Sequence, residues 1–88
     1  MVEHFTANLI GIMAGSLTTM SLVPQVIKTW RSRSVADLSL SMLLVFIAGV
    51  ALWETYGLML GAMPIIVANG FTLALLLALL AMKVRFAP

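Results

Sequence analysis

Residues Phe5–Ile27 read FTANLIGIMAGSLTTMSLVPQVI, and no side chain in this stretch is charged. A helix of this length spans the hydrocarbon core of a bilayer, which is roughly 30 Å thick. Pro24 removes one backbone N–H and crowds the carbonyl of Met20, so the helix is expected to bend or loosen there. In a bilayer, neighbouring helices, side chains or a cavity must satisfy the freed carbonyl. The stretch therefore predicts a membrane-spanning helix with a weak point that can move.

The rest of the chain has the same apolar character. Hydrophobic residues make up 62% of the 88 residues and charged residues only 9%, which is too apolar for a water-soluble domain of this size. The sequence predicts an all-α membrane protein, with a single domain at 1–88 and transmembrane helices at about 5–27, 38–60 and 64–82. Because cysteine is absent, disulfides and thiolate metal sites are excluded.

The basic residues predict the orientation in the membrane. With three spans, the first loop and the C-terminus share one side, and that side carries all five basic residues: Lys28, Arg31, Arg33, Lys83 and Arg85. The positive-inside rule places this side in the cytoplasm and the N-terminus outside. The net charge of +2 is explained by topology and requires no nucleic-acid partner. The N-terminal residues lack the basic region of a signal peptide, so we expect the first span to remain in the mature protein.

Short signals mark the ends and contacts of the helices. Ser34 and Asp37 are expected to cap the second helix, and Pro64 suits the first turn of the third. Gly11-x-x-x-Gly15 and Gly57-x-x-x-Gly61 have the small-residue spacing that lets helices pack closely. The hydroxyl groups before Pro24 have two interpretations, lining a path or bonding backbone carbonyls within a turn, and the second is favoured for Ser21; they belong to Ser16, Thr18, Thr19 and Ser21.

Two side chains stand out by their depth. Trp53 lies roughly 10 Å before the outer end of the second span, and Asn69 lies roughly 7–8 Å into the third. Because these spans are antiparallel, the indole and the carboxamide are expected at a similar level. Polar residues at such depth usually face the bundle or a cavity. The alternatives are that Asn69 is an interhelical hydrogen-bonding residue and that Trp53 fills the core.

An indole together with an amide suits a neutral, polyhydroxylated ligand. The C–H face of a sugar ring packs on the indole, and the amide offers a donor and an acceptor to hydroxyls. A charged substrate would require opposite charges, and the apolar spans supply only Glu54. The sequence contains no metal-ligand cluster, no catalytic triad and no phosphate-binding loop. We therefore expect neither enzymatic activity nor a cofactor.

Four motifs carry a specific resemblance. In order, they are Leu22-Val23-Pro24-Gln25-Val26, Asp37-Leu38-Ser39, Leu52-Trp53-x-x-Tyr56-Gly57 and Ala68-Asn69. Their order and spacing resemble those of bacterial SemiSWEET sugar transporters of the PQ-loop superfamily, over nearly the whole chain. The resemblance implies a three-helix bundle with the third helix between the first two (order 1-3-2). It also implies a parallel homodimer that forms a six-helix transporter in the bacterial inner membrane.

The resemblance further implies roles for individual residues. Trp53 and Asn69 of both protomers would form the sugar pocket, and Pro24 with Gln25 would form the hinge of the first helix. Tyr56 would gate the outer mouth, where an interfacial aromatic is the alternative, and Met42 would lie at the inner gate. The implied function is facilitative transport of mono- or disaccharides by alternating access.

The sequence departs from the family pattern at two places. Leu60 and Ala62 stand where many members carry an arginine and an aspartate that lock the outer gate. Glu54 stands where relatives usually have an apolar residue, and a carboxyl at this depth is costly when ionised. Glu54 either points towards a serine or threonine on a neighbouring helix or has a proton-linked role.

Two other functions fit the same sequence. One is a PQ-loop carrier of another small neutral or zwitterionic metabolite. The other, from a different class, is a non-transporting membrane scaffold or pore-former. A carrier predicts saturable flux that depends on Trp53 and Asn69, whereas a pore predicts unsaturable leakage of unrelated solutes and a scaffold predicts no dependence on either side chain.

Overall fold

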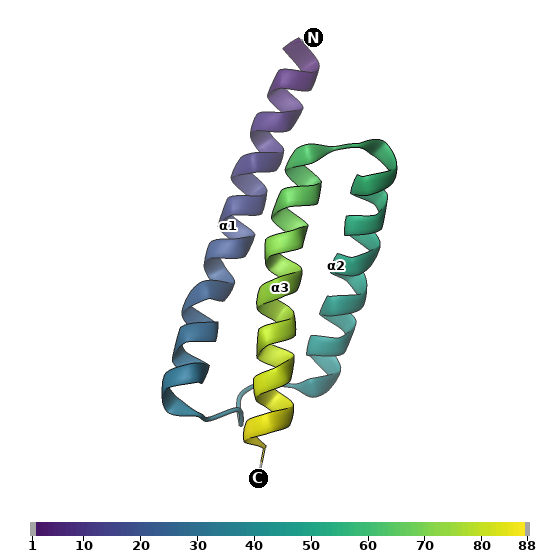
Figure 1. Cartoon of the computed structure of the whole chain (residues 1–88). Helices are drawn as coiled ribbons and strands as arrows, with labels where there is room; N and C mark the ends of the chain where they lie inside the picture. The colour runs from purple at the N-terminus through teal and green to yellow at the C-terminus, as the bar shows by residue number, and fades with distance from the viewer. Residues whose placement is uncertain (1, 88) are drawn as a thin grey trace.

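The computed structural model describes residues 2–87, which form three helices joined by two short loops. They are α1 (Val2–Ser32), α2 (Leu40–Leu60) and α3 (Met63–Phe86). The first loop and the C-terminal end lie at one end of the bundle, and the second loop and the start of α1 lie at the other (Figure 1). Each helix is long and apolar enough to cross a membrane, so the described chain has the build of a multi-pass membrane protein.

The helices extend beyond the apolar segments that predict them. α1 continues to Ser32 and α3 to Phe86, because basic side chains are compatible with the last helical turn, where exposed carbonyls carry partial negative charge. α2 begins later than expected, and its cap is Ser39, whose Oγ accepts from the Met42 N–H at 3.3 Å. The prediction of Ser34 or Asp37 as the cap was wrong. A turn in which the Leu38 N–H donates to Val35 (3.0 Å) keeps the chain non-helical until Ser39.

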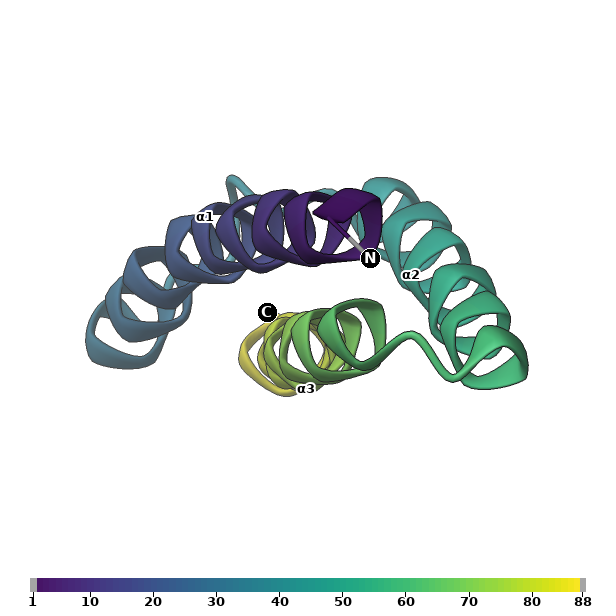
Figure 2. The same ribbon diagram turned by 90° about the horizontal axis from the view of Figure 1, so that it is seen from above.

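α3 lies between the other two helices. Its backbone approaches those of both α1 and α2, whereas within the described residues the backbones of α1 and α2 do not come close to each other. Seen from above, α1 and α2 spread apart over one side of α3 (Figure 2). The predicted order 1-3-2 is therefore confirmed.

Small residues set the distances between the helices. A side chain at Gly15 would collide with the Cβ of Ala68 on α3, and one at Gly57 would lie 2.7 Å from Cγ2 of Ile65. The α1–α3 contact also contains a hydrogen bond between the hydroxyls of Thr19 and Thr72 (3.2 Å). Gly61 differs from the other motif glycines because it ends α2 in the left-handed conformation, with φ 65°. Its role is therefore to make the turn, not to pack against a helix.

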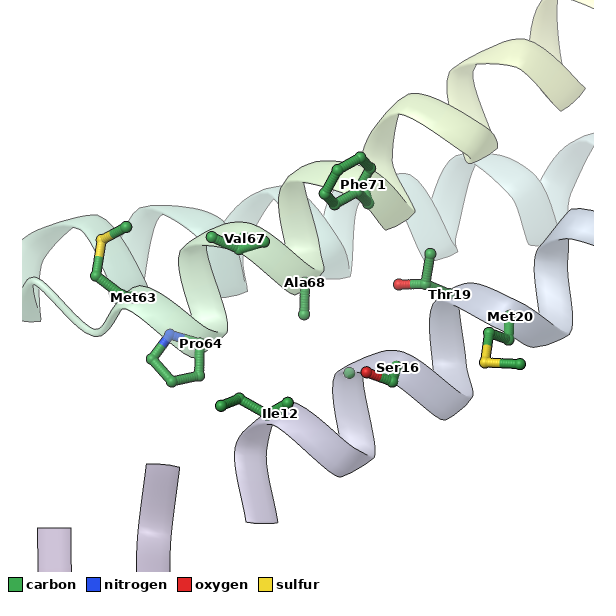
Figure 3. A pocket seen from close by; sticks show the side chains of 10 residues that line it. Ile12, Ser16, Thr19, Met20, Met63, Pro64, Val67, Ala68 and Phe71 are labelled. Atoms are coloured by element: carbon green, nitrogen blue, oxygen red, sulfur yellow. The ribbon is translucent and has the colours of Figure 1, made fainter. Parts of the chain in front are cut away.

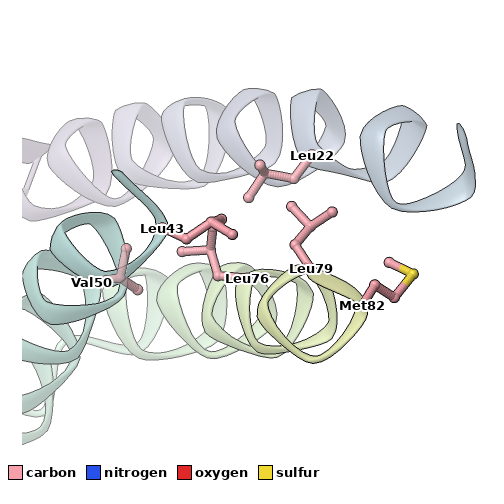
Figure 4. Close-up of a cluster of buried hydrophobic side chains, with 6 residues drawn as sticks. All are labelled: Leu22, Leu43, Val50, Leu76, Leu79 and Met82. Carbon is pink, nitrogen blue, oxygen red and sulfur yellow. The ribbon is translucent and has the colours of Figure 1, made fainter. Parts of the chain in front are cut away.

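The buried core occupies the half of the bundle nearer the first loop. There, side chains from all three helices meet along one side of α3, and Leu76 and Leu79 are almost fully buried (Figure 4). The core residues are Leu22, Leu43, Val50, Leu76, Leu79 and Met82. Most other apolar side chains are exposed, as expected where lipid is the solvent. The half nearer the second loop, which contains Trp53 and Asn69, has fewer buried side chains.

α1 runs as one continuous helix through Pro24. The Ser21 hydroxyl donates to the Thr18 carbonyl (2.7 Å), and the Thr18 hydroxyl donates to the Ala14 carbonyl (3.0 Å). The interpretation of Ser21 as bonding a carbonyl within its own turn is confirmed, although the acceptor is not the carbonyl of Met20 that Pro24 leaves free. Proline therefore weakens the helix here without interrupting it.

Candidate functional site

Trp53 and Asn69 lie at the same level of the bundle. A Cβ atom added at Gly70 of α3 would lie 3.2 Å from Oε2 of Glu54 on α2. Glu54 and Gly70 therefore face each other across the α2–α3 contact. Trp53 and Asn69 are the residues immediately before this pair. The depth argument from the sequence therefore places the two side chains correctly along the membrane normal.

Both side chains also lie on the same side of the α2–α3 contact. Trp53 precedes Glu54 and Asn69 precedes Gly70 by one position, which corresponds to a rotation of about 100° around each helix axis. Because α2 and α3 are antiparallel, both rotations turn the side chain towards the same side of the α2–α3 contact. On α3, Asn69 lies between Ala68, which faces α1, and Ile66, which faces Gly57 of α2. The carboxamide thus occupies the space between α1 and α2, on the side where these helices spread apart (Figure 2).

The aromatic part of the site is a pair of rings. Trp53 and Tyr56 meet edge to face, with ring centroids 5.4 Å apart, and their side chains are 57% and 50% exposed. The Asn69 Nδ2 donates to the Ile65 carbonyl of its own helix (3.1 Å), which leaves Oδ1 to accept from a ligand. The alternative of Trp53 as core filling is inconsistent with this exposure. The pair can offer a ring face and an amide oxygen to a neutral hydroxylated molecule.

A single chain does not enclose this site. Four pockets on the described residues are lined by neither Trp53 nor Asn69. The surroundings of these two residues are open on the side between α1 and α2, whose described residues do not bring their backbones close together. A closed chamber around these side chains therefore requires walls from outside the chain.

Glu54 faces away from the aromatic pair. It lies about 100° around α2 from Trp53, against Gly70, and its Oε1 is buried with no hydrogen-bond partner among the described residues. The expected serine or threonine partner is therefore absent from this part of the chain. A buried carboxyl group without a hydrogen-bond partner is costly, most of all inside a membrane.

The other predicted site residues lie away from Trp53 and Asn69. Gln25, one residue after Pro24, lines a polar pocket of about 300 Å³ at the first-loop end, together with Lys28 and Asp37. Met42 lies near the start of α2, and its side chain is 73% exposed. At the opposite end, Leu60 is the last residue of α2 and Ala62 precedes α3. The hinge and gate residues thus lie at the two ends of the bundle, with the aromatic pair nearer the second loop.

The sequence reasoning did not predict a groove between α1 and α3. This pocket has a volume of about 500 Å³ and is lined by apolar side chains and the hydroxyl-bearing Ser16 and Thr19 (Figure 3). Val67, which lines it, and Asn69 lie on opposite sides of the α1-facing Ala68, so the groove opens away from the aromatic pair. Within residues 5–87, no group of three acidic or histidine side chains could hold a metal ion.

Comparisons with known proteins match most of this chain. Residues 6–66 match the family described as PQ loop repeat. The chain is 42% identical over 85 residues to a sugar transporter SemiSWEET of Bradyrhizobium diazoefficiens, covering 97% of this chain and 99% of that protein. Among solved structures, a bacterial homologue of SWEET transporters superposes with a TM-score of 0.86 at 39% identity, covering 93% of this chain and 99% of the other. A SemiSWEET in the inward-open conformation gives 0.81 at 35% identity, covering 91% and 86%.

Proposed function

The chain belongs to the PQ-loop family and to its SemiSWEET members, and from this membership we propose that it carries mono- or disaccharides across a bacterial inner membrane. The relatives are named as sugar transporters, not as enzymes. The observation that carries the proposal is the placement of Trp53 and Asn69 at one level and on one side of the bundle. A carrier requires such a pocket part of the way through the membrane.

In this proposal, Trp53 stacks on the apolar face of the sugar ring and Asn69 hydrogen-bonds to its hydroxyls. The neighbourhood of the pair supports a neutral ligand, because the carboxyl group of Glu54 is turned towards Gly70 of α3, about 100° around α2 from Trp53. Tyr56, in edge contact with Trp53, lies nearer the second loop and closes the pocket from the outer side. Met42 has the corresponding role at the inner side.

We propose that two copies associate in parallel around an axis along the membrane normal. Each copy places its aromatic pair in the open space between α1 and α2, and a second copy covers this space, so that Trp53 and Asn69 occur twice around one chamber. A closed two-fold dimer is the simplest assembly that completes such a site. The first loop and the C-terminus, which carry the five basic residues, face the cytoplasm.

Alternating access then requires one end of the chamber to narrow as the other opens. Pro24 is the deformable point of α1, which is otherwise a continuous helix. Proline has no backbone N–H, so one hydrogen bond of the helix is missing there. The part of α1 that follows it carries Gln25 and the pocket at the first-loop end. Bending at Pro24 therefore moves the inner end of the chamber. Closure of the outer end relies on Tyr56 and apolar packing, because Leu60 and Ala62 offer no ion pair.

Counterflow of labelled sugars into liposomes tests the proposal. A facilitative carrier gives saturable exchange of a subset of sugars without an added energy source. Unsaturable leakage of unrelated solutes would instead identify a pore-former, and absence of flux for every sugar would favour a scaffold. Saturable exchange of neutral or zwitterionic metabolites, but not of sugars, would assign the chain to another PQ-loop carrier class.

Replacing Pro24 by alanine is expected to slow transport. Pro24→Ala restores a backbone hydrogen bond to the Met20 carbonyl and stiffens α1 by up to about 3 kcal/mol of helix propensity. We expect the maximal rate of sugar counterflow to fall several-fold, with a smaller change in the half-saturating sugar concentration. Pro64→Ala is the matched control, because Pro64 lies in the first turn of α3, where the missing N–H has no intrahelical partner. An unchanged maximal rate in Pro24→Ala would refute the hinge.

Replacing Glu54 by glutamine separates its two interpretations. Because the carboxyl group is turned towards Gly70 of α3 and not towards the ligand side of Trp53, we expect Glu54→Gln to leave the rate of sugar uptake unchanged. Uptake should also be the same with and without a pH gradient across the vesicle membrane. If a gradient accelerates uptake by the unmodified protein but not by Glu54→Gln, Glu54 has a proton-linked role and the carrier is not a simple uniporter.

A further inference from the structure

Two arginines converge on the α1–α3 contact at the end that carries the first loop. Arg33 and Arg85 line a pocket of about 420 Å³ together with the rings of Trp30 and Phe86. The remaining walls are apolar and come from Val26, Ala78, Ala81 and Met82. The pocket thus joins two cationic groups to a hydrocarbon surface.

Stacking holds the guanidinium group of Arg33 in place. Its central carbon lies 4.2 Å from the ring centroid of Trp30 and 4.7 Å from that of Phe86. The residue adopts a left-handed backbone with φ 59°, and its N–H donates to the Thr29 carbonyl at 2.9 Å. A guanidinium has five N–H donors, and none of those of Arg33 has a hydrogen-bond partner among the described residues. Arg33 is therefore oriented but still able to bind an anion.

No acidic side chain of residues 5–87 shares this pocket. Asp37 lines the polar pocket that contains Gln25, and Glu54 lies against Gly70 in the other half of the bundle. Two guanidinium groups at one site favour an anion with several oxygens, because the planar fork matches the geometry of a phosphate. Both arginines are exposed, so a negative partner from outside the described chain can reach them.

The apolar walls continue along the same contact. Phe71 lines the groove between α1 and α3 that also contains Ser16 and Thr19, and Ala78 and Arg85 line the pocket of the two arginines. These three residues follow one another at intervals of seven, so they lie on one face of α3. Both pockets open on the side of the α1–α3 contact away from Trp53 and Asn69. An acyl chain lying along this face would contact Val67 and Phe71 (Figure 3).

We propose that this groove binds an anionic phospholipid. The phosphate bonds to Arg33 and Arg85 at headgroup level, where Trp30 and Phe86 are also suited to lie, and one acyl chain follows the α1–α3 groove. A free phosphate would satisfy the arginines but leave the apolar walls uncovered, so the lipid is the better fit. The bound lipid connects the part of α1 after Pro24 with the end of α3. The site is independent of the sugar pocket and does not rest on the transport proposal.

Quenching by brominated lipids tests this site directly. The chain has two tryptophans, so Trp53→Phe leaves Trp30 as the only indole and as the reporter inside the pocket. The protein is placed in phosphatidylcholine vesicles in which a minor fraction of lipid is brominated phosphatidylglycerol or, for comparison, brominated phosphatidylcholine. We expect the anionic lipid to quench Trp30 more strongly, with its preference falling roughly fivefold for each arginine replaced by glutamine.

Arg31→Gln is the matched control. It removes the same charge two residues earlier, in the last turn of α1, but Arg31 lines a different pocket, with Val23 and Pro24. Arg85→Gln alone keeps the test valid if the loss of stacking in Arg33→Gln prevents folding. The proposal predicts that Arg31→Gln keeps the preference and that excess inorganic phosphate does not relieve quenching. It is overturned by equal quenching from both lipids, by an equal loss in Arg31→Gln, or by relief with phosphate, which would identify a soluble anion as the ligand.

Discussion

Trp53→Ala and Asn69→Ala should each abolish saturable sugar flux in liposomes. Trp53→Ala removes the ring face on which the sugar packs, and Asn69→Ala removes the amide oxygen that accepts from its hydroxyls. If the protein is a two-fold dimer, each substitution deletes two contacts in one chamber. At about 1 kcal/mol or more for each lost contact, two losses reduce binding at least tenfold. Counterflow measured over a range of sugar concentrations reports this loss.

Two control variants distinguish a lost pocket from a misfolded protein. Trp30→Phe changes the other tryptophan, which lies at the first-loop end, and Asn8→Ala changes an exposed asparagine on α1. Both should retain saturable flux. Trp53→Phe should retain part of the flux, because a smaller ring still offers a face. Wild-type flux in Trp53→Ala or Asn69→Ala would refute the assignment of these side chains to the pocket.

Gly15→Ala should strongly destabilise the bundle. A Cβ at this position collides with the Cβ of Ala68, so α1 and α3 must separate or shift. Overpacking of this kind costs about 1–3 kcal/mol, and the hydrogen bond between Thr19 and Thr72, one turn along, would be strained as well. Thermal unfolding of the protein in detergent should therefore show a clear fall in midpoint temperature.

Compensation makes this prediction specific to one contact. Ala68→Gly removes the colliding atom, so the double variant Gly15→Ala with Ala68→Gly should recover most of the lost stability. Gly49→Ala is the matched control, because a Cβ at Gly49 meets no atom within 4 Å and should leave the midpoint unchanged or raise it. Equal midpoints for Gly15→Ala and Gly49→Ala would contradict the close approach of α1 and α3.

The sequence predicted how far along each helix a residue lies better than it predicted which way the residue points. Counting residues along apolar spans placed Trp53 and Asn69 at one level, because helical rise is constant. The direction of Glu54 could not be obtained in this way. Its helix is apolar on all faces, so no amphipathic pattern indicates which face meets α3. The order of the three helices came from the family resemblance for the same reason.

Local backbone geometry was the second limit of prediction. Ser34, Asp37 and Ser39 all have side chains that can cap a helix, and only the turn at Val35–Leu38 selects Ser39. The contact of Arg33 with the rings of Trp30 and Phe86 depends on a left-handed backbone at a residue that is not glycine, which composition does not indicate. The pocket that contains Arg33 and Arg85 could not be predicted, because its lining residues are far apart in the sequence.

The separation of the α1 and α2 backbones has a consequence for biogenesis. When α1 and α2 have left the ribosome and entered the bilayer, their described residues have no close backbone packing with each other, and the helix that both pack against, α3, is made after them. Close packing among these helices therefore begins only when α3 has been inserted. α3 acts as the organiser of the nascent bundle, so a chain truncated before α3 would leave two inserted but loosely associated segments for quality-control proteases.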